Sequence, residues 1–121
     1  MSSARCLLPN GLLMVEALSI FASQTDRVAQ VFEAAQYQDQ ALGAAWRDRM
    51  HIRRTILRAM VQHIADQGQL AQEWTVDEAA DLCYMITLPG PWRELTRELG
   101  WTREQYAEKI ATLLRRTLLA D

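Results

Sequence analysis

The side chains that could bind metal or act as nucleophiles follow no known catalytic spacing. His51 and His63 lie 12 residues apart on one predicted helix and point about 120° apart at ~100° per residue, whereas a zinc-binding helix places its histidines at i and i+4. Cys6 and Cys83 form no Cys-x-x-Cys motif and no ligand spacing with either histidine. No glycine-rich phosphate loop, nucleophile elbow or carboxylate pair stands out. We therefore expect no enzymatic activity, no metal ion and no cofactor.

Arginine supplies 12 of the 13 basic residues, and one predicted helix carries five of them. These five are Arg47, Arg49, Arg53, Arg54 and Arg58. They could form a face for phosphate or another acidic ligand. Alternatively, they are solvated or paired with acidic residues of neighbouring helices, namely Glu94, Glu98, Glu104 and Glu108. We favour the second interpretation because the net charge is -2 and no aromatic residues interleave with the arginines.

Arg53 differs from the other four because it lies within the apolar stripe of its helix. It follows Met50 by three residues and precedes Leu57 by four. A charge at such a position requires a partner. We expect this partner to be either a buried carboxylate or an anionic ligand.

Tryptophan and methionine are abundant for this length, with four and five residues. Helical spacing places Trp46, Met50 and Met60 on one face, where the first predicted helix could meet them. Periodicity alone favours ordinary core packing. The alternative is an apolar pocket for a small molecule, enclosed by the first two helices. The candidate ligand-binding residues are Met14, Phe21, Trp46, Met50, Arg53 and Tyr84.

Composition indicates one helical domain over residues 1–121, half of whose residues are apolar. The net charge of -2 argues against an autonomous nucleic-acid-binding domain. The two cysteines indicate reduced thiols and a cytoplasmic protein. The apolar opening of the chain is interrupted by Pro9 and Gly11 and then by Glu16. We expect a buried helix there, because the uninterrupted part is too short for a membrane span of ~20 residues.

The predicted fold is an all-α bundle of about five helices. Sustained apolar/polar alternation is lacking, which makes strands unlikely. Thr75 and Thr102 each precede a Glu or Gln by three residues, a pattern typical of a capping box at a helix start. Gly68 and Gly100 are expected to end helices. The predicted helices span about residues 12–35 (one helix, or two divided near residue 25), 39–67, 75–88, 92–99 and 102–118.

The last predicted helix carries a wide apolar stripe. Its residues are Tyr106, Ile110, Leu113, Leu114, Thr117 and Leu118. Such a stripe packs either within the core of its own chain or against a second copy, and symmetric dimers are the commonest oligomers. Both possibilities remain open at this point.

Several segments, in order and spacing, resemble the C-terminal regulatory domain of TetR-type (tetracycline-repressor-like) bacterial transcriptional regulators. The clearest are residues 74–82 (WTVDEAADL) and residues 100–106 (GWTREQY), the latter followed by a leucine-rich helix. Residues 31–35 (VFEAA), 42–46 and 68–70, together with Arg53-Arg54, fit the same pattern. The similarity spans the chain from about residue 28 onward.

This resemblance implies a domain that binds a small apolar or amphipathic effector and forms a homodimer. In the family, the effector changes the spacing of the two helix-turn-helix DNA-binding domains of the dimer. The affinity for the effector and the affinity for the operator are thereby coupled. The resemblance assigns the dimer interface to residues 79–88 and 106–118. The interface residues are expected to be Leu82, Met85, Tyr106, Ile110, Leu113, Leu114, Thr117 and Leu118.

No segment before Leu12 has room for the family's DNA-binding head of roughly 50 residues. We therefore expect a truncated regulator or one that has lost its DNA-binding domain. We also expect that this chain itself does not bind an operator. The alternative function is a stand-alone helical protein–protein interaction module, such as an adaptor that pairs with a regulator and has no effector site.

Overall fold

The computed structural model describes residues 26–120, and this part of the chain is all-helical. Residues 26–35 are helical. The named helices that follow are α2 (Gln40–Asp66), α3 (Val76–Ile86), α4 (Pro89–Arg93), the π-helical turn η1 (Glu94–Glu98) and α5 (Arg103–Leu118). Within residues 26–120 the β structure is limited to one isolated antiparallel bridge between Leu70 and Leu119.

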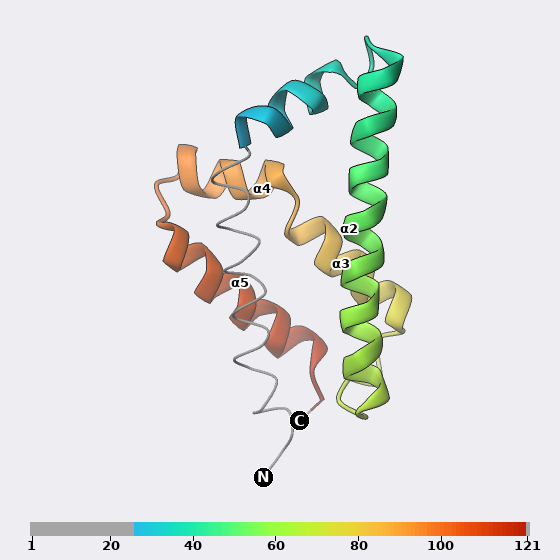
Figure 1. Cartoon of the computed structure of the whole chain (residues 1–121). Coiled ribbons are helices and arrows are strands. Elements are labelled where there is room, and N and C mark those ends of the chain that lie inside the picture. The colour runs from blue at the N-terminus through green and yellow to red at the C-terminus, as the bar shows by residue number, and fades with distance from the viewer. Residues whose placement is uncertain (1–25, 121) are drawn as a thin grey trace.

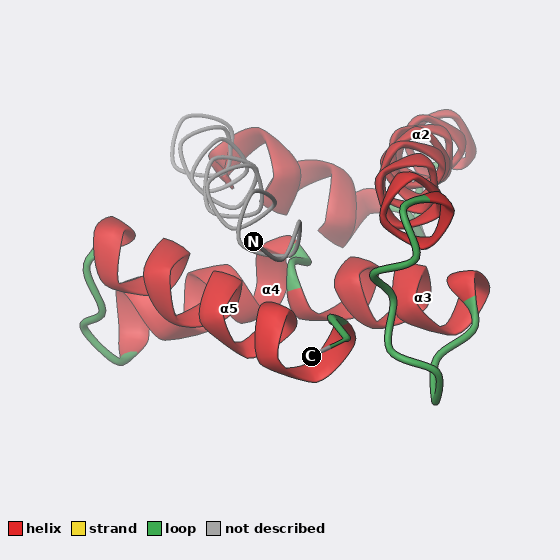
Figure 2. Cartoon of the chain, turned by 90° about the horizontal axis from the view of Figure 1, so that it is seen from below, coloured by secondary structure: helices red, strands yellow, loops and turns green. Residues whose placement is uncertain are grey.

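The helices form two layers. The long helix α2 packs along α3, and Figure 2 shows α3, α4 and α5 in one layer, with α2 and the helical segment 26–35 above it in the view. In Figure 1 the helical segment 26–35 crosses the top of the molecule from α4 and η1 to the start of α2. None of the helices in the described part is long and apolar enough to cross a lipid bilayer.

Both predicted capping boxes are confirmed. The Thr75 hydroxyl accepts a hydrogen bond from the Glu78 amide at 3.1 Å, and the Glu78 carboxylate accepts one from the Thr75 amide at 3.1 Å. Thr102 and Gln105 form the same reciprocal pair at the start of α5. These bonds satisfy amides that would otherwise lack partners in the first helical turn. Sequence therefore placed the starts of α3 and α5 correctly.

The turn between α3 and α4 differs from the prediction. The helix ending at Ile86 stops before Pro89 as expected, but the next helix begins at Pro89 itself and not near Trp92. Proline suits the first position of a helix, because its missing N–H would have no partner there. The chain continues into η1, where the Leu99 amide donates to the Glu94 carbonyl at 3.0 Å.

The hydrophobic core lies where α2, α3, α4 and α5 meet. The buried residues of this core are Leu57, Val61, Ala79, Ala80, Cys83, Trp92, Tyr106, Ala107, Ile110, Leu114 and Leu118. Burial of a large apolar side chain such as those on α5 contributes about 1.5–3 kcal/mol. The small residues Ala79, Ala80 and Ala107 let the helices approach closely. The core therefore fixes α3 between α2 and α5.

Gly43 is the one glycine inside a predicted periodic segment, and the structure gives the reason. A Cβ atom at this position would lie 2.5 Å from the carbonyl oxygen of Gln36. The turn that follows the segment 26–35 therefore packs directly on the backbone of α2. In contrast, Gly68 and Gly100 adopt φ of 71° and 79°, the left-handed conformation predicted for residues that follow helix ends.

Candidate functional site

Arg53 reaches from α2 across to the C-terminal end of α3. Its Nη1 donates to the Tyr84 carbonyl oxygen at 3.1 Å, and its Nη2 donates to the carbonyl and hydroxyl oxygens of Thr87. The guanidinium carbon lies 5.6 Å from the centre of the Tyr84 ring. Because α3 has no basic residue in its own last turn, Arg53 supplies the positive charge that a helix C-terminus favours. We call Arg53, Tyr84, Thr87 and Tyr106 the Arg53 cluster.

Burial controls the electrostatics of this cluster. It lowers the pKa of the Arg53 guanidinium, while Tyr106 and Tyr84 act in the opposite direction. Burial also raises the pKa of Tyr106 to about 12, against a smaller effect of Arg53. Cys83, whose carbonyl accepts a hydrogen bond from the Thr87 hydroxyl at 2.6 Å, has its pKa raised to about 11 by burial. A thiol of this kind stays protonated near neutral pH and is a poor nucleophile.

Arg53 has no carboxylate partner among residues 26–120, and the anionic ligand expected as the alternative stays a prediction. We expected a buried carboxylate or an anionic ligand, and the structure provides neutral oxygen acceptors at a helix end. No ion pair between residues 26 and 120 includes Arg53. Periodicity could not predict these hydrogen bonds, because they depend on where the end of α3 lies relative to α2.

The structure brings only some of the predicted ligand-binding residues together. Arg53 and Tyr84 are in contact across α2 and α3, and both are half-buried. Trp46 is buried and Met50 half-buried on the same helix as Arg53. Met14 and Phe21 lie outside the described residues.

The expected partners of the α2 arginines are wrong for two of the five. Arg54 pairs with Asp81 at 2.9 Å, and Arg58 pairs with Asp77 at 2.7 Å. We expected glutamates of the later helices, but α2 packs along α3 and therefore meets the carboxylates on the outer face of α3. All four side chains are more than half exposed, so each pair contributes little stability.

A second charged cluster was missed by the sequence analysis. The Asp26 side chain is only 1% exposed, and its Oδ1 accepts a hydrogen bond from Nε of Arg93 at 2.8 Å. Its Oδ2 lies 3.3 Å from Nη2 of Arg97, in an ion pair without hydrogen-bond geometry. Arg93 also lies 3.4 Å from Glu33. These four residues, the Asp26 cluster, join the segment 26–35 to α4 and η1.

One signal in the sequence pointed toward the Asp26 cluster. Arg93 and Arg97 are four residues apart on a predicted helix, so they share a face. Asp26, however, lies in a polar stretch that gave no indication of burial. Its partner is 67 residues away in sequence, and only the packing of the segment 26–35 brings the two together.

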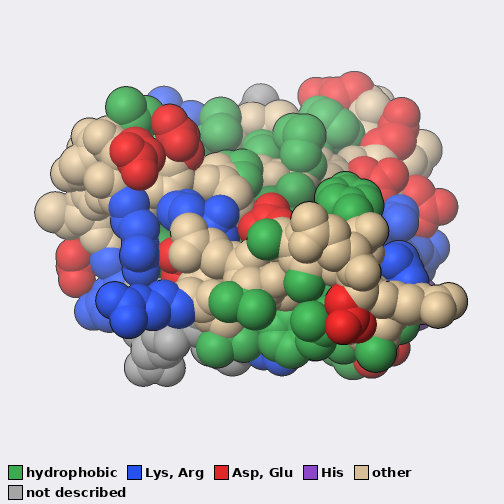
Figure 3. All heavy atoms as spheres, turned by 90° about the horizontal axis from the view of Figure 1, so that it is seen from above, with side chains coloured by type: hydrophobic (Ala, Val, Ile, Leu, Met, Phe, Trp, Pro, Cys, Tyr) green, Lys and Arg blue, Asp and Glu red, His purple; other side chains and the backbone are tan. Residues whose placement is uncertain are grey.

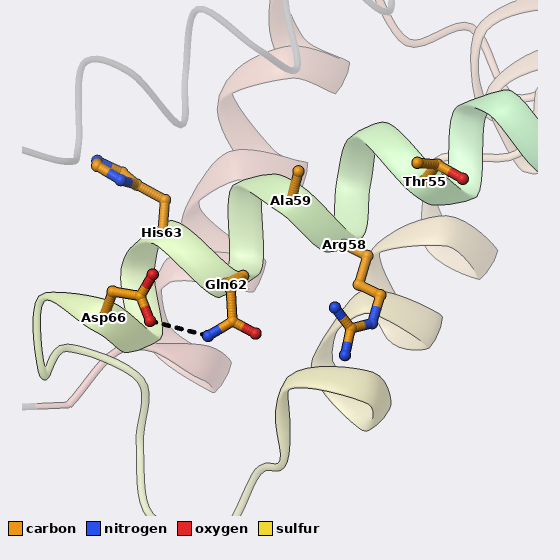
Figure 4. A pocket seen from close by; sticks show the side chains of 6 residues that line it. All are labelled: Thr55, Arg58, Ala59, Gln62, His63 and Asp66. Carbon is orange, nitrogen blue, oxygen red and sulfur yellow. Dashed lines mark hydrogen bonds between the residues drawn. The ribbon is translucent and has the colours of Figure 1, made fainter.

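One surface hollow lies on the outer face of α2, and Figure 4 shows that all its lining residues come from this helix. They are Thr55, Arg58, Ala59, Gln62, His63 and Asp66. Gln62 donates to Asp66 at 2.9 Å, and most of the lining is exposed. None of the predicted ligand-binding residues lines this hollow. An open, polar depression on one helix does not have the form of a small-molecule site, which is typically enclosed and apolar.

The predicted interface residues divide into two groups. Tyr106, Ile110, Leu114 and Leu118 are buried in the core of their own chain. Four of the six residues of the α5 stripe thus pack within their own chain, and contact of the stripe with a second copy stays a prediction. Met85 and Leu113 are 54% and 49% exposed, and Leu82 and Thr117 are half-buried. These last four residues are the members of the predicted set that a second chain could contact.

Apolar side chains are also exposed elsewhere. Ile52 and Ile56 on α2 are 52% and 56% exposed, and Val28 and Val31 are 57% and 61% exposed. Seen from above, in Figure 3, apolar side chains remain visible between groups of basic and acidic side chains. Exposed residues of this kind provide contact area for another protein.

Comparison of the chain with protein-family models, curated proteins and solved structures gives no match.

Proposed function

We propose that this chain is the effector-sensing and homodimerisation domain of a TetR-type transcriptional regulator. In this proposal the domain has no enzymatic activity and binds a small apolar or amphipathic molecule. It controls DNA binding through a helix-turn-helix domain that is not part of these 121 residues. Differential affinity of the effector for two conformations would provide the coupling.

The observation that carries the proposal is the pair of exposed apolar residues on α3 and α5. Met85 and Leu113 are about half exposed, and they lie on the two helices that the family resemblance assigns to the dimer interface. Both helices also begin with capping boxes within the segments that carry the resemblance, residues 74–82 and 100–106. An all-helical chain with a two-layer arrangement is compatible with this function (Figure 2).

The test is the mass of the purified protein in solution, measured by native mass spectrometry. We expect a dimer of twice 13.8 kDa, and additional mass if an effector is retained. The variants Met85→Glu and Leu113→Glu should each give monomers, because a charge would be buried in the interface. Ile52→Glu, a matched change on α2, should leave the dimer intact. A monomeric wild-type protein, or dimer loss only in Ile52→Glu, would contradict the proposal.

The alternative is a helical interaction module without an effector site. Ile52 and Ile56 favour it, because they lie one helical turn apart on the outer face of α2 and are both more than half exposed. A monomer that retains no small molecule and loses binding to a partner regulator on Ile52→Glu would support this alternative.

A further inference from the structure

Among residues 26–120, the electric charge of Arg53 is incompletely balanced. Of the five arginines on α2, it is the one that is half-buried, while the other four are exposed. Its hydrogen bonds go to neutral oxygens of Tyr84 and Thr87. A helix C-terminus carries roughly half a negative charge. The end of α3 therefore offsets only part of the charge of the guanidinium.

A partly desolvated positive charge is stabilised by an anion nearby. Burial lowers the pKa of Arg53, which means that the surroundings disfavour its charged form. Its Nη atoms donate to the end of α3, and its Nε–H has no acceptor among residues 26–120. Arg53 thus retains a donor that a carboxylate can use in a charge-assisted hydrogen bond.

The neighbours of the Arg53 guanidinium include an aromatic ring, an apolar side chain and a second cation, since Arg54 also lies 5.8 Å from the centre of the Tyr84 ring. The ring of Tyr84 lies against the guanidinium, and Met50 is three residues earlier on α2, on the same helical face. A cation beside half-buried apolar and aromatic side chains matches a molecule with one negative group and an apolar body.

We propose that Arg53 binds the carboxylate of an amphipathic carboxylic acid whose apolar part lies against the half-buried side chains of Met50 and Tyr84. This inference rests on the effector-sensing function proposed above and specifies the chemical class of the effector. A carboxylate would form a hydrogen bond with Nε–H while the Nη atoms continue to hold the end of α3. The ligand would thereby contact α2 at a point where that helix is fixed to α3.

Isothermal titration calorimetry with octanoate and 1-octanol tests the inference, because the two probes share an apolar chain and differ in the charged group. We expect the wild-type protein to bind octanoate at least about tenfold more tightly than octanol, as one charge-assisted hydrogen bond would give. Arg53→Met should remove this preference and leave octanol binding unchanged. Arg58→Met, a matched change at an exposed arginine of the same helix, should leave the preference intact.

Arg53→Lys keeps the inference testable if Arg53→Met does not fold, since it retains the positive charge and should retain a reduced preference for octanoate. Equal affinity for the two probes, or a preference that survives Arg53→Met, would overturn the carboxylate inference and leave the effector function standing. Absence of binding of both probes to the wild-type protein would also overturn it. The mass measurement decides the proposed function independently, because dimerisation requires neither probe.

Discussion

The Asp26 cluster and the Arg53 cluster both use arginine to join helices, and they differ in how the charge is balanced. In the first, a buried carboxylate meets Arg93 at 2.8 Å and Arg97 at 3.3 Å. In the second, a half-buried guanidinium meets only neutral oxygens and aromatic rings among the described residues. A paired buried charge fixes a local structure, whereas a cation with partial compensation can still gain from an anion. This difference is the reason that the carboxylate ligand is proposed for the second cluster and a structural role for the first.

The largest effect is expected when Arg93 is removed. Arg93→Met leaves the Asp26 carboxylate, only 1% exposed, with the more distant Arg97 as its remaining cation. Loss of one partner from a buried ion pair costs about 3–5 kcal/mol, and urea unfolding followed by circular dichroism would measure this loss. Arg97→Met should cost less, because the Arg97 side chain is 46% exposed. Equal losses for the two variants would show that burial of Asp26 does not control the energetics of this cluster.

Alkaline pH should act on the Arg53 cluster and its neighbour Cys83. The pKa of Cys83 is raised from 9.0 to about 11, and that of Tyr106 from 10.0 to about 12. The folded state therefore keeps protons that the unfolded chain releases. Their contribution is fully present below about pH 9 and is lost as pH rises through the folded pKa values. At the limit we expect a loss of roughly 2–3 kcal/mol for each group.

Urea unfolding at a series of pH values from about 8 to 11 would measure this loss. Tyr106→Phe removes one of the two titrations and should flatten the upper part of the curve. A free energy of unfolding that stays constant across this range would show that neither group is desolvated as the structure indicates.

The sequence predicted the helix starts well because the relevant signals are local. Thr75 and Thr102 form their capping boxes with residues only three positions away, and Gly68 and Gly100 take the predicted left-handed conformation. The all-helical fold followed from composition and periodicity for the same reason. A residue whose structural role is decided within one helical turn can be assigned from the sequence alone.

The two clusters could not be predicted fully because their partners are distant in the chain. Arg53 was correctly identified as a charge within an apolar stripe, but its acceptors lie 31 and 34 residues away. Asp26 gave no signal, since its burial depends on how the segment 26–35 packs. Periodicity likewise identified the apolar stripe of α5 without showing whether it faces its own core. Long-range packing decides all three cases.

A change at Gly43 would show whether the segment carrying Asp26 is also held at its other end. A Cβ on residue 43 would lie 2.5 Å from the Gln36 carbonyl oxygen, so Gly43→Ala must displace the segment 26–35 from α2. Overpacking of this kind costs about 1–3 kcal/mol. At Gly90 a Cβ would meet nothing within 4 Å, and Gly90→Ala should be close to neutral. Thermal unfolding of both variants checks this, and equal stability would mean that the contact at Gly43 relaxes without cost.

The smallest effects are expected at the exposed ion pairs beside the Arg53 cluster. Arg54→Met and Arg58→Met should each lower the free energy of unfolding by about 1 kcal/mol or less, because exposed pairs are screened by solvent. Arg53→Met changes a residue that also contacts α3 and should lower the free energy of unfolding by about 1.5–3 kcal/mol. Hydrogen bonds to charged groups are stronger than neutral ones, and their loss leaves the carbonyl oxygens of α3 without a partner. Urea unfolding of the three variants gives the comparison. If Arg54→Met costs as much as Arg53→Met, then burial does not distinguish Arg53 from its neighbours, and its hydrogen bonds to the end of α3 are no stronger than an exposed ion pair.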